Sequence, residues 1–230
     1  MSTDLKTSDI SIIIPTLNEA STIGKLLSVL HTVPGVEPIV VDGGSRDNTV
    51  DIAESNGAQV LNCAPGRAFQ MNCGAKTASG TVLLFLHSDT IPPPGFAAEI
   101  RNNLQQPGVS AGAFTLSIGG NGFLLRLLEM LINFRARTMQ MPYGDQGLFM
   151  TSGMFAAVGG FPEQPLMEDF ELVRRLRRRG TIIILPIAAT TSDRRWRRLG
   201  VLRTTLRNQA IIIGYLLGIS PDKLAGWYRR

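Results

Sequence analysis

The chain of 230 residues is long enough for one large domain with a full hydrophobic core. Hydrophobic residues make up 44% of it and charged residues 18%, which excludes an intrinsically disordered protein. The formal net charge of +5 is unevenly distributed, because fourteen Lys and Arg follow Leu172 against only Asp193 and Asp222. This basic end indicates an anionic partner, which could be a diphosphate, an anionic membrane surface or a nucleic acid, or else a solvated helix face.

Cys63 and Cys73 are too few for a disulfide framework, so we expect reduced thiols. The polar N-terminus does not resemble a secretory signal, and the apolar stretch 210–219 is too short to span a bilayer. We expect residues 210–219 to form a core helix, with a helix on a membrane surface as the alternative. The expected location is the cytoplasm, with peripheral contact at the inner face of the membrane left open.

The first half of the chain alternates apolar strands with helices. The run Ile10 to Ile14 is β-branched and is followed by Pro15, which predicts a buried strand. Further strands are predicted over 38–41, 60–61 and 81–86, and helices over a segment capped by Ser21 or Thr22, over 47–55 and over 67–78. This alternation implies a parallel sheet with right-handed crossovers.

The second half is less regular. Helices are predicted over 123–139 and 168–179, a strand over 181–185, a helix within 200–217 and a last helix that begins at Pro221. We therefore expect an α/β fold, in which residues 1–198 form a Rossmann-like sheet with flanking helices. Residues 199–230 are expected to be a basic helical C-terminal extension packed on that domain.

Ligands of such sheets bind beyond the carboxyl ends of the strands, where this chain has three polar segments, 15–19, 42–45 and 87–89. Asp42 could accept hydrogen bonds from a ribose or a base, and Gly43 would let the backbone approach a ligand closely. The alternative is that Asp42 caps the helix over 47–55. Neither a Gly-x-Gly-x-x-Gly nor a Walker pattern is present.

Asp89 lies just past a predicted strand, where its carboxylate could bind Mg²⁺ or Mn²⁺. His87 could add a ligand or orient one through a hydrogen bond. The alternative is that Asp89 only begins the turn before Ile91. Glu168 and Asp169 either offset a helix dipole or supply a general base that takes a proton from an acceptor hydroxyl.

Five segments in this order resemble family 2 glycosyltransferases, which are inverting enzymes of the GT-A fold. The segments are Ile-Ile-Pro-Thr-Leu-Asn-Glu, Val-Val-Asp-Gly-Gly-Ser-Arg-Asp-Asn-Thr, Asn72-x-Gly74, Leu-Phe-Leu-His-Ser-Asp-Thr and Glu168-Asp169. The resemblance covers roughly residues 10–185. It implies an α/β GT-A domain and transfer of a sugar from a nucleotide diphosphate to a hydroxyl group.

The resemblance also implies roles for individual residues. Asp169 would be the catalytic base, and Glu168 would help to position the acceptor. Asp89 would be the metal ligand, as the last acid of a D-x-D element in which His87 replaces the first acid. The residues expected to bind the nucleotide sugar are Pro15, Thr16, Asn18, Glu19, Asp42, Gly43, Arg67, Asn72, His87, Ser88, Gln146 and Arg195.

The segment Arg194-Arg195-Trp196 matches only part of the Q-x-x-R-W element of processive members, because no Gln stands three residues before Arg195. We therefore expect a non-processive enzyme, in which Arg194, Arg195 or Arg197 could clamp a pyrophosphate.

The predicted function is metal-assisted single displacement with Mg²⁺ or Mn²⁺. The donor is expected to be a UDP-sugar, with GDP left open, and the hydroxyl acceptor is unidentified, with a lipid-linked one included. The alternative is an inactive protein that binds a nucleotide sugar or a membrane surface. Nucleic acid is not expected as a partner, because the arginines are not interleaved with aromatic stacking platforms.

Overall fold

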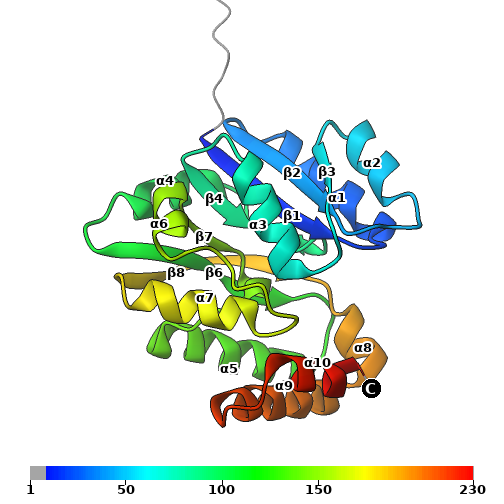
Figure 1. The fold of residues 1–230 in the computed structure, drawn as a ribbon, viewed down its shortest axis with the longest axis vertical. Helices are drawn as coiled ribbons and strands as arrows, with labels where there is room; N and C mark the ends of the chain where they lie inside the picture. Colours follow the sequence, from blue (N-terminus) through cyan, green and yellow to red (C-terminus); the bar gives the residue numbers. More distant parts are fainter. Residues whose placement is uncertain (1–8, 230) are drawn as a thin grey trace, which may run out of the picture.

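The computed structural model describes residues 9–229 and is organised around one eight-stranded mixed sheet (Figure 1). The polar N-terminal residues 1–8 and Arg230 lie outside the described residues. The sheet order is β3-β2-β1-β4-β7-β6-β8-β5. The strands are β1 (Ile10–Thr16), β2 (Val36–Asp42), β3 (Gln59–Asn62), β4 (Val82–Phe85), β5 (Thr90–Ile91), β6 (Val109–Ile118), β7 (Leu148–Thr151) and β8 (Thr181–Thr191).

Helices cover both faces of this sheet. They are α1 (Ala20–His31), α2 (Thr49–Ser55), α3 (Arg67–Thr77), α4 (Phe96–Leu104), α5 (Phe123–Met139), α6 (Ser152–Ala157), α7 (Glu168–Arg177), α8 (Arg194–Leu199), α9 (Val201–Leu216) and α10 (Pro221–Arg229), with a short 3₁₀ turn η1 (Gly144–Gln146).

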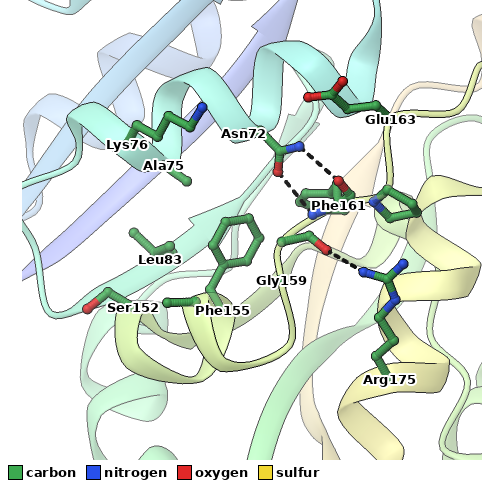
Figure 2. Close-up of a pocket in the computed structure, with 13 residues that line it drawn as sticks. Asn72, Ala75, Lys76, Leu83, Ser152, Phe155, Gly159, Phe161, Glu163 and Arg175 are labelled. Carbon is green, nitrogen blue, oxygen red and sulfur yellow. Dashed lines mark hydrogen bonds between the residues drawn. The ribbon is translucent and has the colours of Figure 1, made fainter.

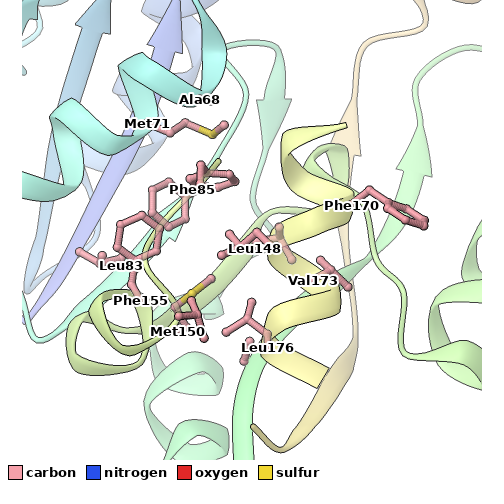
Figure 3. Packing of buried hydrophobic residues seen from close by; sticks show 14 of the residues in the cluster. Ala68, Met71, Leu83, Phe85, Leu148, Met150, Phe155, Phe170, Val173 and Leu176 are labelled. Atoms are coloured by element: carbon pink, nitrogen blue, oxygen red, sulfur yellow. The ribbon is translucent and has the colours of Figure 1, made fainter. Parts of the chain in front are cut away.

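The apolar run of β1 supplies both faces of the sheet. Ile12 and Ile14 belong to the core cluster under α1 and α4, whereas Ile13 belongs to the cluster shared with α3 and α7. Figure 3 shows part of this second cluster, including Met71 of α3 and Val173 of α7. Successive side chains of a strand point to opposite faces, so a strand buried on both faces needs a continuous apolar run. The expectation of a buried strand here is confirmed, although it extends past Pro15 to Thr16.

The parallel sheet predicted from the first half of the chain is confirmed, and the second half adds antiparallel strands to it. β1 pairs in parallel with β2 and β4, and β2 with β3, as predicted. However, β7 runs antiparallel between β4 and β6, with Leu84 opposite Phe149. The short β5 is antiparallel to β8. The β6 and β7 strands were not predicted, because no β-branched run announces either of them.

β6 and β8 form a long parallel pair with two register shifts, one between Val109 and Ala111 and one between Phe114 and Thr115. Phe114 lies opposite Leu185 and Thr115 opposite Ala188, so Pro186 and Ile187 are left out of the register. Proline cannot donate to the ladder, which explains why the second shift lies there. The strand predicted over 181–185 therefore continues across Pro186 to Thr191.

Most helix predictions are confirmed with small shifts in their ends. The helix over 123–139 has the predicted bounds, and α10 begins at Pro221 as expected. The predicted caps of the first helix are wrong, because α1 begins at Ala20 and Glu19 occupies the N-cap position ahead of Ser21 and Thr22. Likewise α2 begins at Thr49 rather than at Asp47.

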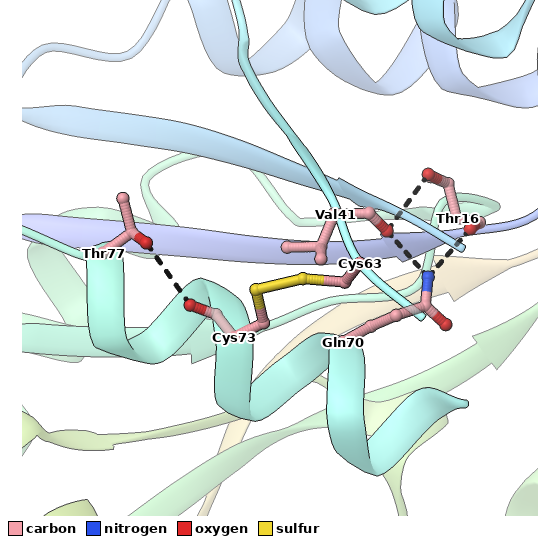
Figure 4. The surroundings of a disulfide bond; sticks show 6 residues. All are labelled: Thr16, Val41, Cys63, Gln70, Cys73 and Thr77. Carbon is pink, nitrogen blue, oxygen red and sulfur yellow. Dashed lines mark hydrogen bonds between the residues drawn. A yellow bond between two sulfur atoms is a disulfide. The ribbon is translucent and has the colours of Figure 1, made fainter. Parts of the chain in front are cut away.

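The expectation of two reduced cysteines is contradicted, because the structure joins Cys63 and Cys73 in a disulfide (Figure 4). Cys63 follows the end of β3 and Cys73 lies on α3, so the short connection brings them together. None of the helices within residues 9–229 is long and apolar enough to cross a membrane.

The helices α8 to α10 lie together with α5 at one end of the molecule (Figure 1). Ile211 of α9 and Leu224 of α10 are buried in the same cluster as Phe170 of α7. The boundary between a domain and an extension at residue 198 stays a prediction.

Candidate functional site

The segment after β2 is organised by the Asp42 carboxylate, which is 2% exposed. Its Oδ2 accepts hydrogen bonds from the backbone N–H groups of Gly44 and Ser45, each at 2.8 Å, and the Ser45 hydroxyl donates to Oδ1. The Thr16 hydroxyl donates to Oδ1 at 3.5 Å. Asp42 therefore fixes the loop at the strand end with both of its oxygens.

The segment after β1 is tied to the same loop. Asn18 has a left-handed backbone (φ 56°), and its side-chain oxygen accepts a hydrogen bond from the N–H of Arg46 at 2.8 Å. The N–H of Asn18 donates to the Ser45 hydroxyl at 2.8 Å. An Asn tolerates the left-handed region better than most residues, so this position suits it. The two strand ends thus form one connected rim.

Glu19 and Asp89 meet at this rim through a shared cation. The Nη2 atom of Arg194 lies 2.8 Å from a carboxylate oxygen of Glu19 and 3.1 Å from one of Asp89. Both carboxylates are partly exposed and line a cavity of about 500 Å³ together with Arg195, Arg198 and Leu199. The cavity therefore combines two acids with several arginines.

A second cavity of about 330 Å³ lies on the other side of Arg195, which lines both. Its polar wall consists of Arg67, His87, Tyr143, Asp145, Glu168, Asp169 and Asn208. Its apolar wall includes Phe170 of α7, Ile211 and Ile212 of α9 and Tyr228 of α10. The shared arginine makes the two cavities neighbours.

Asp169 is oriented by two backbone groups. Its Oδ2 accepts a hydrogen bond from the N–H of Gly144 at 2.8 Å, and its Oδ1 accepts one from the N–H of Phe170 at 2.8 Å. A β-carbon at Gly144 would lie 3.2 Å from Asp169 Oδ2 and 3.2 Å from His87 Nε2, so a larger residue would press on both side chains. The carboxylate is held in place at the cavity wall.

Glu168 precedes it and is nearly buried, with its Oε1 3.6 Å from Nε of Arg67. Burial raises the pKa of Glu168, the positive charge of Arg67 opposes the rise, and Asp169 adds to it. The neighbouring Asp145 also has a raised pKa because of burial. The wall thus holds three acids, two of which have environments that disfavour their charged forms.

His87 lies against Arg67 at the base of this cavity, with Nε2 next to Nη2. Burial lowers the pKa of His87 well below its ordinary value, and the positive charges of Arg67 and Arg195 lower it further. The imidazole is therefore neutral, and its Nε2 faces a guanidinium.

Comparison with known proteins shows the family. The model of glycosyl transferase family 2 matches residues 11–159, which is more than half of the chain. The chain belongs to glycosyl transferase family 2. The membership that the motifs predicted is thereby confirmed, and the match spans the rim segments at Glu19, Asp42 and Asp89.

Curated relatives of this family 2 chain are similar to it over part of their length. A PGL/p-HBAD biosynthesis glycosyltransferase of Mycobacterium tuberculosis is 40% identical over 88 residues, which cover 34% of this chain and 34% of that protein. A 4,4'-diaponeurosporenoate glycosyltransferase of Staphylococcus haemolyticus is 35% identical over 92 residues, 36% of this chain and 24% of that protein. The similarity thus spans about a third or less of these curated relatives.

Solved structures confirm the GT-A fold. A mannosyltransferase from Pyrobaculum calidifontis, in complex with GDP-Man and Mn²⁺, has a TM-score of 0.65 at 19% identity, over 80% of this chain and 56% of that one. The glucosyl-3-phosphoglycerate synthase of Mycobacterium tuberculosis, in complex with Mn²⁺, UDP-glucose and phosphoglyceric acid, has a TM-score of 0.61 at 22% identity, over 81% and 72%.

The structure brings together only part of the predicted site of this family 2 chain. Glu19, Asp89 and Arg195 line the first cavity, and Arg67, His87, Glu168, Asp169 and again Arg195 line the second. Pro15, Thr16, Asn18, Asp42, Gly43 and Ser88 belong to the strand ends, where Thr16, Asp42 and Ser88 are buried. A β-carbon at Gly43 would lie 3.0 Å from the Gln70 amide, which itself donates to Thr16 and Val41 carbonyls.

Two predicted contacts lie elsewhere. Both amide atoms of Asn72 bond the backbone of Phe161, at 2.8 and 3.0 Å, beside a separate cavity of about 600 Å³ (Figure 2). Gln146 is fully buried, where its side chain donates to the Phe114 carbonyl and accepts from the N–H of Tyr143. Both residues use their amides to hold loops in place.

The prediction of site residues missed Tyr143 and Asp145. The Arg135 guanidinium carbon lies 3.6 Å from the centre of the Tyr143 ring, so an α5 residue reaches the acidic wall. Asp145 directly precedes Gln146, which is one of the predicted sugar-binding residues, and this adjacency was the available signal. No sequence signal pointed to Arg135, because only the folded structure brings α5 to the loop that carries Tyr143 and Asp145.

Proposed function

We propose that this chain is an inverting, non-processive glycosyltransferase that moves a sugar from a nucleotide diphosphate to an acceptor hydroxyl in one displacement. The observation that carries the proposal is the pair of cavities joined at Arg195. The first cavity has two acids and several arginines, which suit a cation and a diphosphate. The second cavity has the oriented carboxylate of Asp169, which suits a general base.

The first cavity is proposed to hold the donor. Glu19 and Asp89 both bond the guanidinium of Arg194, which supports a cation site between them, and a Mg²⁺ or Mn²⁺ ion held together with substrate phosphates needs only one or two carboxylates. Within residues 9–229 there is no cluster of three or more possible metal ligands, which favours such a bridging ion over a complete protein cage. When bound, the ion would neutralise charge on the departing diphosphate.

The residues around Asp89 would then act on the diphosphate directly. Arg194, released from its carboxylates, and Arg195 and Arg198 can donate paired hydrogen bonds to phosphate oxygens. The solved neighbours that hold Mn²⁺ contain GDP-mannose in one case and UDP-glucose in the other. We propose UDP as the nucleotide, with a GDP-sugar as the alternative to be tested.

The second cavity is proposed to hold the acceptor. Asp169 would take the proton of the acceptor hydroxyl as its oxygen attacks the anomeric carbon, and the diphosphate would leave from the opposite side. The hydrogen bond from Gly144 keeps one oxygen of Asp169 fixed at the wall. Glu168, with its raised pKa, would position the acceptor through a hydrogen bond. One displacement inverts the configuration at that carbon.

The substitution Asp169→Asn tests the assignment of the base. Because the amide cannot take the proton, turnover should fall about 10²- to 10⁴-fold, while donor binding is kept. Transfer would be measured with a panel of acceptors and donor binding by thermal shift with UDP-sugars and GDP-sugars, with and without Mn²⁺. The control is Asp51→Asn, an exposed acid on α2 outside both cavities.

Product configuration is the second readout of this test. NMR of the product should show an inverted anomeric centre. A retained configuration, or full activity of Asp169→Asn, would refute the mechanism. A wild-type protein that binds a nucleotide sugar but neither transfers nor hydrolyses it would be a binding protein.

A further inference from the structure

Exposed apolar side chains gather at one end of the molecule. Among residues 9–229, only Leu17 and Phe69 of the large exposed hydrophobic residues lie outside α5 and residues 202–227. The most exposed members include Phe123 at 80% and Leu217 at 77%. Large contiguous apolar patches are rare on monomeric proteins and mark surfaces that contact a protein or a membrane.

The α5 helix is apolar on two opposite sides. Leu125, Leu128 and Ile132 pack on β6. Phe123, Leu127, Met130 and Phe134 follow helical spacing and are exposed. At about 100° per residue, the exposed stripe lies on the side of the helix opposite to the packed one. The sheet therefore satisfies one side of α5 and leaves the other without a protein partner within the described chain.

The α9 helix repeats this arrangement. Leu202, Leu206, Ile213 and Leu216 are exposed at helical spacing, whereas Ile211 is buried toward the second cavity. Val201 at the start of α9 packs with Leu125 of α5 in one small cluster, which joins the two helices. Figure 1 shows α5, α9 and α10 together at the end of the molecule away from α1 and α2. We call the exposed sides of α5 and α9 the apolar platform.

The charge around the apolar platform is strongly positive. Residues 199–230 contain four Arg and one Lys, with Asp222 as their one acid. Arg197 is exposed and Arg203 alternates with the apolar positions of α9. On α5 the one acid, Glu129, is already bonded to Arg126 and to the backbone of Ile118. Exposed Arg137, which has no acidic partner among the described ion pairs, completes the basic border.

This charge selects the partner. A second copy of the chain packed on the same face would bring like charges together, which disfavours such a dimer. An anionic bilayer satisfies both properties, since apolar side chains enter the acyl boundary and arginines meet lipid phosphates. We propose that the apolar platform docks on an anionic lipid bilayer, with α5 and α9 lying in the plane of the interface.

This proposal does not depend on the transferase activity. Should that activity be correct, α9 would connect the bilayer to the acceptor, because Asn208, Ile211 and Ile212 line the second cavity from the same helix. A lipid-linked acceptor would then reach Asp169 from the membrane surface.

Vesicle co-sedimentation of the full chain tests the proposal. Vesicles of phosphatidylcholine alone are compared with vesicles that also contain phosphatidylglycerol, at low and high salt. We expect binding to the anionic vesicles only, weakened by salt because exposed charges are screened. The double substitution Phe134→Glu with Leu206→Glu should weaken this binding tenfold or more, since both side chains are about two-thirds exposed and would have to leave the bilayer.

A matched pair of charge variants isolates the electrostatic part. Arg203→Glu should weaken binding to anionic vesicles several-fold, whereas Lys25→Glu on α1 makes the same charge change and should leave it unaltered. Circular dichroism and donor thermal shift would show that each variant is folded and that the transferase site is intact, independently of vesicle binding.

Three outcomes would overturn the proposal. The first is equal binding to neutral and anionic vesicles, and the second is binding that the double substitution leaves unchanged. The third is a protein that ignores vesicles and sediments as a dimer, which the double substitution converts to a monomer. That result would assign the apolar platform to a second copy of the chain.

Discussion

Arg194 connects two acids that lie 175 and 105 residues away from it in the chain. Although burial works against its charge, the hydrogen bonds that Arg194 donates to Glu19 and Asp89 raise its pKa. All three side chains are partly exposed, at 46%, 24% and 23%, so each ion pair contributes only about 0.2–1 kcal/mol. An arrangement of this strength can be displaced by a divalent ion and a diphosphate.

Replacement of Arg194 by Ala should have opposite effects on two ligands. Mn²⁺ alone should bind about two- to fivefold more tightly, because no guanidinium competes for Glu19 and Asp89. A nucleoside diphosphate without metal should bind more weakly, because one phosphate donor is lost. The dissociation constants of Mn²⁺ and of the nucleoside diphosphate can both be measured by titration calorimetry.

Arg197→Ala is the matched control on the same helix, since Arg197 is 77% exposed and only 3.9 Å from Asp193. We expect it to leave both constants unchanged. An unaltered or lower Mn²⁺ affinity in Arg194→Ala would show that the arginine does not stand in the place of the ion.

Two neighbouring elements depend on the small size of a single residue. Gly112 of β6 lies opposite Phe149 of β7, and a β-carbon there would overlap the Phe149 ring and approach Ile183 to 2.9 Å. Phe149 is fully buried and contacts Phe114 through rings 5.7 Å apart, so it has no free space to move into. This antiparallel pair thus requires glycine for steric reasons.

Gly112→Ala should therefore destabilise the protein by about 1–3 kcal/mol through overpacking. Gly153→Ala makes the same change in α6, where no atom lies within 4 Å of the added carbon, and should stabilise the helix by up to about 1 kcal/mol. Denaturant unfolding of both variants shows whether each substitution lowers or raises the free energy of unfolding. Equal effects would mean that packing around Phe149 can relax.

The same elements show where sequence reasoning stops. β1, α1 and α5 were predictable because their apolar periodicity is long and their neighbours along the chain are turn residues. β6 begins Val-Ser-Ala-Gly-Ala; Phe149 packs against Gly112, and α7 shares a core cluster with the neighbouring alanines, contacts that no local pattern contains. The antiparallel place of β7 depends on the same tertiary contacts.

For the candidate site, residues at strand ends were predictable and their partners were not. Asp42, Asp89 and Glu19 could be named because the carboxyl ends of parallel strands meet at one rim. The bridge through Arg194 and the hydrogen bond from Gly144 to Asp169 arise only when distant segments fold together. Asn72 shows the converse, since its side chain is taken up by the Phe161 backbone.

Across the whole molecule, the C-terminal helices share a core with the sheet. Leu224 of α10 is fully buried beside Gly214 of α9, where an added β-carbon would lie 2.9 Å from it. The cluster that contains Leu224 and Ile211 also contains Ile13 of β1 and Leu148 of β7. The second cavity is lined by Tyr228 of α10 as well as by Asp169 of α7. These contacts predict one cooperative unit rather than a domain with an independent extension.

Leu224→Ala tests this unity. Loss of a fully buried Leu side chain should cost about 2–5 kcal/mol and lower the single thermal transition of the whole chain, because α10 unfolds together with the sheet. Leu217→Ala, at 77% exposure, makes the same chemical change with an expected effect within about 0.5 kcal/mol. Calorimetry counts the thermal transitions, and a spectroscopic probe placed on each half of the molecule shows which part unfolds in each of them. If Leu224→Ala splits off a separate early transition and leaves the main one in place, residues 199–230 fold on their own, and the second cavity would lose its apolar wall before the sheet unfolds.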